Sequence, residues 1–210
     1  MTSEPTTFCS ALCLLGIQNG GLPDPSCPNA SSHLGGQLDN TEMLKCHAIQ
    51  TLLLHVQTNV EVLSRSNDKC TAVYAITLPV SGLRFVLKAA WDQAIEEQKR
   101  EHQLYEQMEG VQGSSIPACL GAFEMEAQSL ISSVDTHFLM LSWAGVSVTE
   151  GIIRPNEKQC KHAPLYWRSA SHILRTAGIV HNDTDWRNLF YNPVIDDFML
   201  VDFSRAFVAN

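Results

Sequence analysis

Hydrophobic and polar positions alternate along the chain in segments that predict helices and strands from residue 41 onward. Residues 41–56 place apolar side chains at helical spacing, whereas 70–79 and 83–90 are short apolar runs typical of strands. The proline and glycine between these two runs favour a hairpin turn. Residues 91–110 predict a charged helix that a glycine ends.

The pattern continues with two further strands and a long helix. Residues 116–124 and 137–143 predict strands, and 163–178 predicts a helix. Because strands dominate the first part and helical spacing the second, the sequence predicts an α+β fold. We expect helix plus antiparallel sheet over 41–148, followed by a helical region over 149–210.

The first forty residues have a different composition. Residues 16–40 are rich in Gly, Pro, Ser and Asn, so they offer little apolar area to offset the entropy lost on ordering. The sequence therefore predicts a flexible extension over 1–40. Cysteine and histidine, which can bind zinc, occur in this extension and just after it. The CxxxC spacing is loose and no second tight pair follows, so the pattern favours reduced thiols over a zinc site. The residues concerned are Cys9, Cys13, Cys27, His33, Cys46 and His47.

Composition excludes several classes of partner. The net charge is −8 with 45% hydrophobic residues, so we expect an acidic globular protein that binds neither nucleic acid nor anionic membrane. The apolar run 8–17 is too short to span a bilayer, and Glu4 stands where a secretory signal carries positive charge. The 7 cysteines lack the regular spacing of a disulfide framework. These features predict a cytoplasmic protein.

Polar groups gather in an otherwise apolar stretch near the end of the chain. His181, Asp183 and Asn188 lie between short hydrophobic runs, and Asp202 follows the next run. Burying a carboxylate without a partner costs several kcal/mol, so such groups are exposed, paired or bound to a cation. Asp and Asn oxygens suit a small hard cation, and a second Asp can accept a proton from a hydroxyl.

Two charged residues of the first half complete a chemically coherent set. Lys88 lies on the same face of a predicted strand as Val86, and Glu101 lies on the apolar side of the helix that follows. A lysine can hold phosphate oxygens, and a carboxylate can hold that lysine in place. Together with the polar groups near the end of the chain, these residue types fit a magnesium nucleotide.

Four segments occur in the order and approximate spacing found in the protein-kinase-like superfamily: FVLKAA, REHQLYEQM, HNDTDWRN and VDFSRA. The chain most resembles the small fungal kinase-like and aminoglycoside-phosphotransferase-like proteins, whose loop reads HxDxxxxN. The resemblance covers about residues 61–210. It implies a two-lobed fold with an antiparallel sheet in the N-lobe and a helical C-lobe, which we expect to be incomplete and C-terminally truncated because the chain stops at Asn210.

The resemblance also implies how a nucleotide would bind. Lys88 would contact the phosphates of ATP with Glu101 as its ion-pair partner, and Val86 would cover the adenine. Residues 141–145 would form the hinge between the lobes.

A second set of roles concerns the reaction itself. Asp183 would be the catalytic base, Asn188 and Asp202 would bind Mg²⁺, and His181 would brace the loop. The function that follows is transfer of the γ-phosphate of ATP to a hydroxyl of a protein or a small molecule.

Two other functions remain open. Residues 62–74, which would cover the phosphates, contain no glycine, and Asp185 stands where most protein kinases have a lysine. Both features fit a pseudokinase or truncated kinase-like module that acts by binding a partner. A metal-dependent hydrolase using Asp183 and Asp202 is the third possibility, and it would give Lys88 and Glu101 no role.

Overall fold

The computed structural model of the chain describes residues 7–22, 24–33, 41–54, 56–79, 81–126, 134–149 and 157–209. Its fold is α+β, with an antiparallel sheet and several helices, as the sequence predicts. The chain forms two compact units. Unit 1 lies within 1–99 and 118–143, and unit 2 within 100–117 and 144–210. The chain last passes from one unit to the other between Trp143 and Ala144, inside the segment expected to form a hinge.

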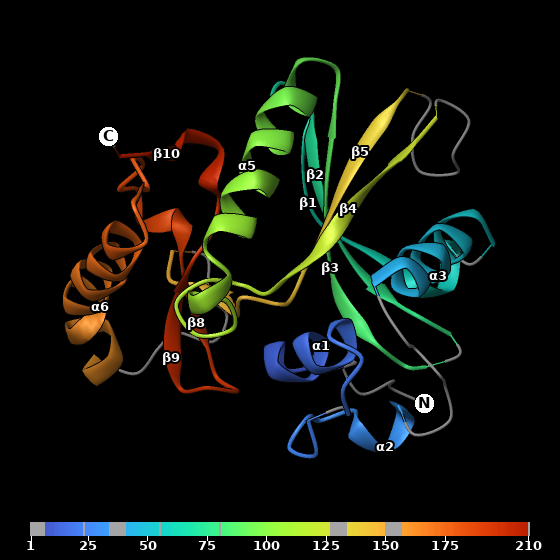
Figure 1. Cartoon of the computed structure of the whole chain (residues 1–210), viewed down its shortest axis with the longest axis horizontal. Coiled ribbons are helices and arrows are strands. Elements are labelled where there is room, and N and C mark those ends of the chain that lie inside the picture. The colour runs from blue at the N-terminus through green and yellow to red at the C-terminus, as the bar shows by residue number, and fades with distance from the viewer. Residues whose placement is uncertain are drawn as a thin grey trace. The chain divides into compact units, whose positions relative to one another are not determined.

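Unit 1 contains a five-stranded antiparallel sheet (Figure 1). Its strand order is β1-β2-β3-β5-β4. The predicted strands are present, and residues 62–74 form most of a hairpin in which a tight turn over 67–70 joins β1 to β2. The strands are β1 Val60–Ser66, β2 Thr71–Thr77, β3 Arg84–Trp91, β4 Cys119–Met125 and β5 Thr136–Leu141.

Alternation along β3 separates the core from the candidate site. Phe85 and Leu87 are fully buried and belong to the hydrophobic core that the helices of unit 1 share with the sheet. Val86 and Lys88 point to the opposite face of the strand, as predicted from the period of two residues. The helices of this unit are α1 Ala11–Gln18, α2 Ala30–His33, α3 Thr41–Leu54 and α4 Val56–Asn59.

The prediction of a flexible extension over 1–40 is wrong for the residues that the structure describes there. Helix α1 begins after Ser10, whose hydroxyl caps the helix by accepting a hydrogen bond from the Cys13 N–H at 3.1 Å. Leu14 and Ile17 of this helix are buried in the core of unit 1. A few buried apolar and sulfur-bearing side chains thus order the segment, and its average composition underestimates their contribution.

The helix predicted over 91–110 is α5 Ile95–Gln107, and it begins in unit 1 and ends in unit 2. A 3-10 turn over Glu109–Val111 follows, so Gly110 lies in that turn instead of ending the α-helix. The apolar side of this helix, on which Glu101 was predicted to lie, is buried, since each of these residues is at most 6% exposed: Glu101, Leu104, Tyr105 and Met108.

Besides the end of α5, unit 2 contains one long helix and short strands (Figure 1). Strands β6, β8 and β9 form one antiparallel sheet, and β7 pairs with β10. A turn over residues 193–196, which includes Asp196, joins β8 to β9, and Asp197 begins β9. The elements are β6 Val146–Ser147, α6 Glu157–Thr176, β7 Ile179–Val180, β8 Leu189–Asn192, β9 Asp197–Leu200 and β10 Phe207–Val208. None of the helices in the described part of the chain combines the length and apolar character that crossing a bilayer requires.

Candidate functional site

The loop between β7 and β8 carries Asp183, whose carboxylate is held from several sides. Its Oδ1 accepts the Asp185 N–H at 3.2 Å, and its Oδ2 lies 3.3 Å from Arg187 Nη2 and 3.7 Å from Arg205 Nη1. Desolvation of this side chain, which is 11% exposed, acts to raise its pKa. The Asp185 N–H, the amide of Asn188 and the Arg187 guanidinium outweigh that effect and lower the pKa of Asp183 below its usual range. Asp183 is therefore ionised at neutral pH.

His181 stabilises the same loop through a hydrogen bond to the chain that follows β9. Its Nε2 donates a hydrogen bond to the carbonyl oxygen of Val201 at 3.0 Å, and its ring packs 4.9 Å from that of Phe203. Burial lowers the pKa of His181, although the Val201 carbonyl and the carboxylates of Asp202, Asp183 and Glu101 act to raise it. A neutral imidazole with the proton on Nε2 therefore joins the loop to the end of β9, which agrees with the predicted role as a brace.

Asn188 and Asp202 lie at the two ends of the β8–β9 hairpin. Asn188 is 2% exposed, and its carbonyl oxygen accepts the Val201 N–H at 3.0 Å, which places it beside the residue that precedes Asp202. Its amide lies close enough to Asp183 to lower the pKa of that carboxyl, but no described atom meets hydrogen-bonding geometry with its Nδ2. Asp202 has a left-handed backbone, with φ 65° and ψ 76°, at the start of a 3-10 turn.

Glu101 reaches the same turn from helix α5. Its Oε1 accepts the N–H of Phe203, the residue after Asp202, at 3.3 Å, and Tyr105 from the next turn of the helix packs edge-on against the Phe203 ring. The carboxylate is only 1% exposed. Unit 2 thus brings together four of the predicted site residues: Asp183, Asn188, Asp202 and Glu101.

Lys88 and Val86 lie on β3 of unit 1. Lys88 pairs with Val73 on β2 and with Leu139 on β5, and its carbonyl oxygen accepts the side-chain N–H of Gln98 at 2.8 Å. Lys88 is partly exposed, and Val86 is 9% exposed. The predicted ion pair between Lys88 and Glu101 joins residues of the two units and stays a prediction.

Sequence reasoning missed the arginines beside Asp183. Arg187 bridges two carboxylates, since its Nη1 also lies 3.5 Å from Asp185 Oδ2, while Asp185 accepts the Arg187 N–H at 3.0 Å and so begins a 3-10 turn. Trp186 is 44% exposed, and its ring centroid lies 6.1 Å from that of Trp167 on α6. The available signal was that Asp183 and Asp185 precede Arg187 by four and two residues, because opposite charges at these separations meet in a tight turn.

No family model matches the chain. The chain is 23% identical over 219 residues to the meiotic driver SPOK2 of Podospora anserina, an alignment that covers 97% of this chain and 26% of SPOK2. The chain thus spans about a quarter of the length of that relative.

Proposed function

We propose that this chain is an ATP- and Mg²⁺-dependent phosphotransferase with a two-lobed kinase-like fold, which transfers the γ-phosphate to a hydroxyl acceptor. The observation that carries the proposal is the arrangement in unit 2. An ionised Asp183 lies in a loop that His181 joins to the end of β9, and Asn188 and Asp202 flank the hairpin next to it. Carboxylate and amide groups in one braced loop suit the positioning and charge stabilisation on which phosphoryl transfer depends.

The low pKa of Asp183 defines what it would do. A carboxylate this acidic is a weak base, so its first task would be to orient the acceptor hydroxyl through a hydrogen bond. It would accept the proton late, as the bond to phosphorus forms. The Asp185 N–H and Arg187 hold the carboxylate in place for this task.

The donor set near this loop fits Mg²⁺, which prefers carboxylate and carbonyl oxygens. Asn188 and Asp202 would hold the ion, whose charge offsets that of the phosphate oxygens. A buried amide such as that of Asn188, with an unpartnered Nδ2 among the described residues, is a group that a bound ligand or water would satisfy. Lys88 and Val86 of unit 1 would contact the nucleotide, with Glu101 as the ion-pair partner of Lys88.

Arg187 and Arg205 compensate for one departure from the kinase pattern. Asp185 replaces the lysine that many kinases have at this position, yet two guanidinium groups lie within 4 Å of the Asp183 carboxylate. Arg187 is 46% exposed and Arg205 66% exposed, so both can reorient toward a phosphoryl group. We propose that they supply the positive charge that the lysine would provide.

The likeness to SPOK2 sets the scope of the proposal. The aligned region is 26% of that meiotic driver, so the proposal concerns the chemistry of this module and not the drive activity. A pseudokinase that binds a partner is the competing function. Its supporting observation is apolar side chains exposed on unit 2, namely Trp186, Phe207 and Val208.

Calorimetric titration with ATP, with and without Mg²⁺, tests the proposal. Binding should require Mg²⁺ and be lost in Asp202→Ala and in Lys88→Ala. Asp196→Asn is the matched control, because Asp196 is an exposed carboxylate at the other end of β9, and it should bind as the wild type does. ATP binding by a folded chain that is indifferent to Lys88 and Asp202 would refute the proposed site.

Transfer is tested separately with labelled ATP and a mixture of hydroxyl acceptors. Asp183→Asn should keep Mg²⁺-dependent ATP binding and lose transfer. Binding without any transfer by the wild-type chain would favour the pseudokinase function.

A further inference from the structure

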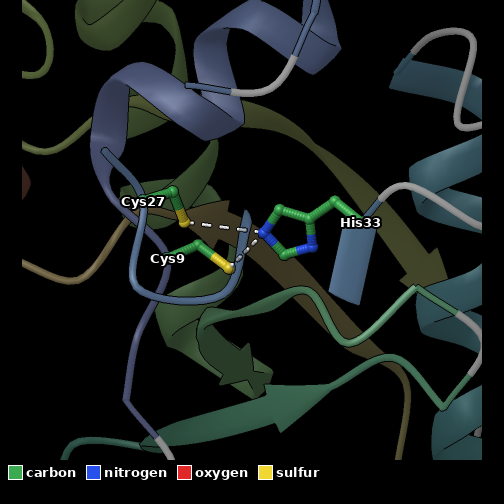
Figure 2. A group of neighbouring side chains, drawn as sticks. All are labelled: Cys9, Cys27 and His33. Atoms are coloured by element: carbon green, nitrogen blue, oxygen red, sulfur yellow. Dashed lines mark hydrogen bonds between the residues drawn. The ribbon is translucent and has the colours of Figure 1, made fainter. Parts of the chain in front are cut away.

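Two thiols and an imidazole from the N-terminal segment meet in the interior of unit 1. His33 Nε2 lies 3.4 Å from the Sγ of Cys9 and 3.5 Å from the Sγ of Cys27, as Figure 2 shows. All three ligand atoms lie within 4.8 Å of one another. Each residue is at most 5% exposed. Cys9 precedes α1, Cys27 lies in the turn before α2, and His33 ends α2, so three separate pieces of chain converge on this point.

A fourth sulfur lies beside this group. Cys13, in the first turn of α1, is fully buried. It belongs to the same buried cluster of unit 1 as Cys9 and Cys27. Together with the three ligand atoms that lie within 4.8 Å of one another, the Cys13 thiol would complete the number and type of ligands in a Cys₃His zinc site.

The surroundings of the group are those of metal ligands. His33 Nδ1 donates a hydrogen bond to the carbonyl oxygen of Ser81 at 2.9 Å, and Nε2 faces the thiols. Metal-binding histidines almost always donate their second N–H in this way. Burial raises the pKa of the Cys9 thiol to about 11, although Cys9 Sγ accepts the Arg84 N–H at 3.3 Å and an Asn29 side-chain N–H at 3.4 Å, which both act to lower it.

We propose that Cys9, Cys13, Cys27 and His33 bind one structural Zn²⁺. In a tetrahedral zinc site, Zn–S bonds of about 2.3 Å and Zn–N bonds of about 2.0 Å separate the nitrogen from each sulfur by about 3.5 Å. The observed separations of 3.4 and 3.5 Å match this value. Because all four residues are buried, the ion would have no open position for a substrate, and its role would be structural.

The ion would hold the N-terminal segment on the sheet. The four ligands come from residues 9–33, whereas Ser81 and Arg84, which bond to His33 and Cys9, lie just before and at the start of β3. Zinc binding free energy becomes folding free energy when the site forms only in the folded chain. Removal of the ion should therefore release α1 and α2 and destabilise the strand that carries Lys88.

Metal analysis of the chain, purified without chelators, tests the proposal. We expect one zinc per chain by inductively coupled plasma mass spectrometry, released when the thiols are blocked with a mercurial. Exchange for Co²⁺ should give the intense d–d bands of a tetrahedral site and thiolate-to-cobalt charge-transfer bands. Cys27→Ser should lose the metal, and Cys46→Ser should keep it, since Cys46 is exposed on α3 and serves as the matched control.

A second variant keeps the test decisive if Cys27→Ser does not fold. His33→Cys converts the site to four cysteines, so it should retain one metal per chain and show stronger charge-transfer absorption with Co²⁺. A folded wild-type chain that binds neither zinc nor cobalt would overturn the proposal. So would retention of the metal by folded Cys27→Ser, or a disulfide among these cysteines in the freshly purified, metal-free chain.

Discussion

Gly145→Ala is predicted to destabilise the part of unit 2 that supports the candidate site. Gly145 has φ +112° and lies just before β6, whose Val146 pairs with Tyr191 on β8. A Cβ at this position would meet the Tyr191 carbonyl oxygen at 2.0 Å and its carbonyl carbon at 2.4 Å. Both are backbone atoms, so no side-chain rotation can relieve the overlap.

The cost has two parts. A positive φ costs a residue with a Cβ about 1–2 kcal/mol. An ordinary non-bonded contact needs about 3.5 Å, so the backbone at Tyr191 must shift by about 1.5 Å. A shift of that size breaks about two ladder hydrogen bonds between β6 and β8, at about 1 kcal/mol each. The expected loss is about 3–4 kcal/mol, a large part of the roughly 5–15 kcal/mol that typically stabilises a domain.

Variants at two further glycines distinguish the cost of backbone strain from the cost of atomic overlap. Gly178 has φ +76°, but no described atom lies within 4 Å of the position that an alanine Cβ would take, so Gly178→Ala should cost only the strain of about 1–2 kcal/mol. Gly110 has neither a positive φ nor a described atom within 4 Å, so Gly110→Ala should be neutral or stabilise by up to about 1 kcal/mol. Urea unfolding followed by tryptophan fluorescence measures all three. A cost for Gly145→Ala that is no larger than that for Gly178→Ala would refute the overlap argument.

Three other predictions concern charge in unit 2. Because burial lowers the pKa of His181, the unfolded chain binds a proton at mildly acidic pH that the folded chain does not, so stability should fall as pH drops below about 6.5. Urea midpoints measured between about pH 7.5 and about pH 5.5 should show a weaker fall for His181→Phe than for the wild type. Glu101→Gln should cost about 1–2 kcal/mol in urea unfolding, because it replaces a buried charged hydrogen-bond acceptor by a neutral one, whereas the exposed Glu109→Gln should stay within about 0.5 kcal/mol. Arg187→Gln should raise the pKa of Asp183 toward its usual value, as carboxyl carbon NMR titration would detect; an unchanged pKa would contradict the role assigned to the guanidinium.

Local pattern was enough to predict the three longest helices and four strands of the five-stranded sheet. The period of two residues along β3 assigns Phe85 and Leu87 to the core, and helical spacing predicts the buried stripe of α5. Both predictions hold because burial at these positions depends on the direction in which each side chain points. The two-residue strands β6, β7 and β10 were not predicted, because pairing with a distant partner, and not local composition, creates them.

The candidate site shows the same division between local and distant causes. Asp183, Asn188 and Asp202 could be chosen from sequence because polar residues between apolar runs need a partner or a ligand. The bond from His181 to Val201 spans twenty residues, and the bond from Glu101 to Phe203 spans more than a hundred. Sequence alone gives the types of group in the site, whereas the fold decides which of them support one another.

The N-terminal segment shows where average composition is a poor guide to order. A segment poor in apolar residues is expected to stay disordered because it cannot bury enough area to offset the entropy lost on ordering. That reasoning assumes that apolar burial is the only source of order. In residues 7–33, cysteine and histidine side chains converge where apolar ones would otherwise pack, and a bound Zn²⁺ would contribute on the order of 10 kcal/mol to folding. Sulfur and imidazole ligands that the fold brings together can therefore order a segment whose composition favours disorder.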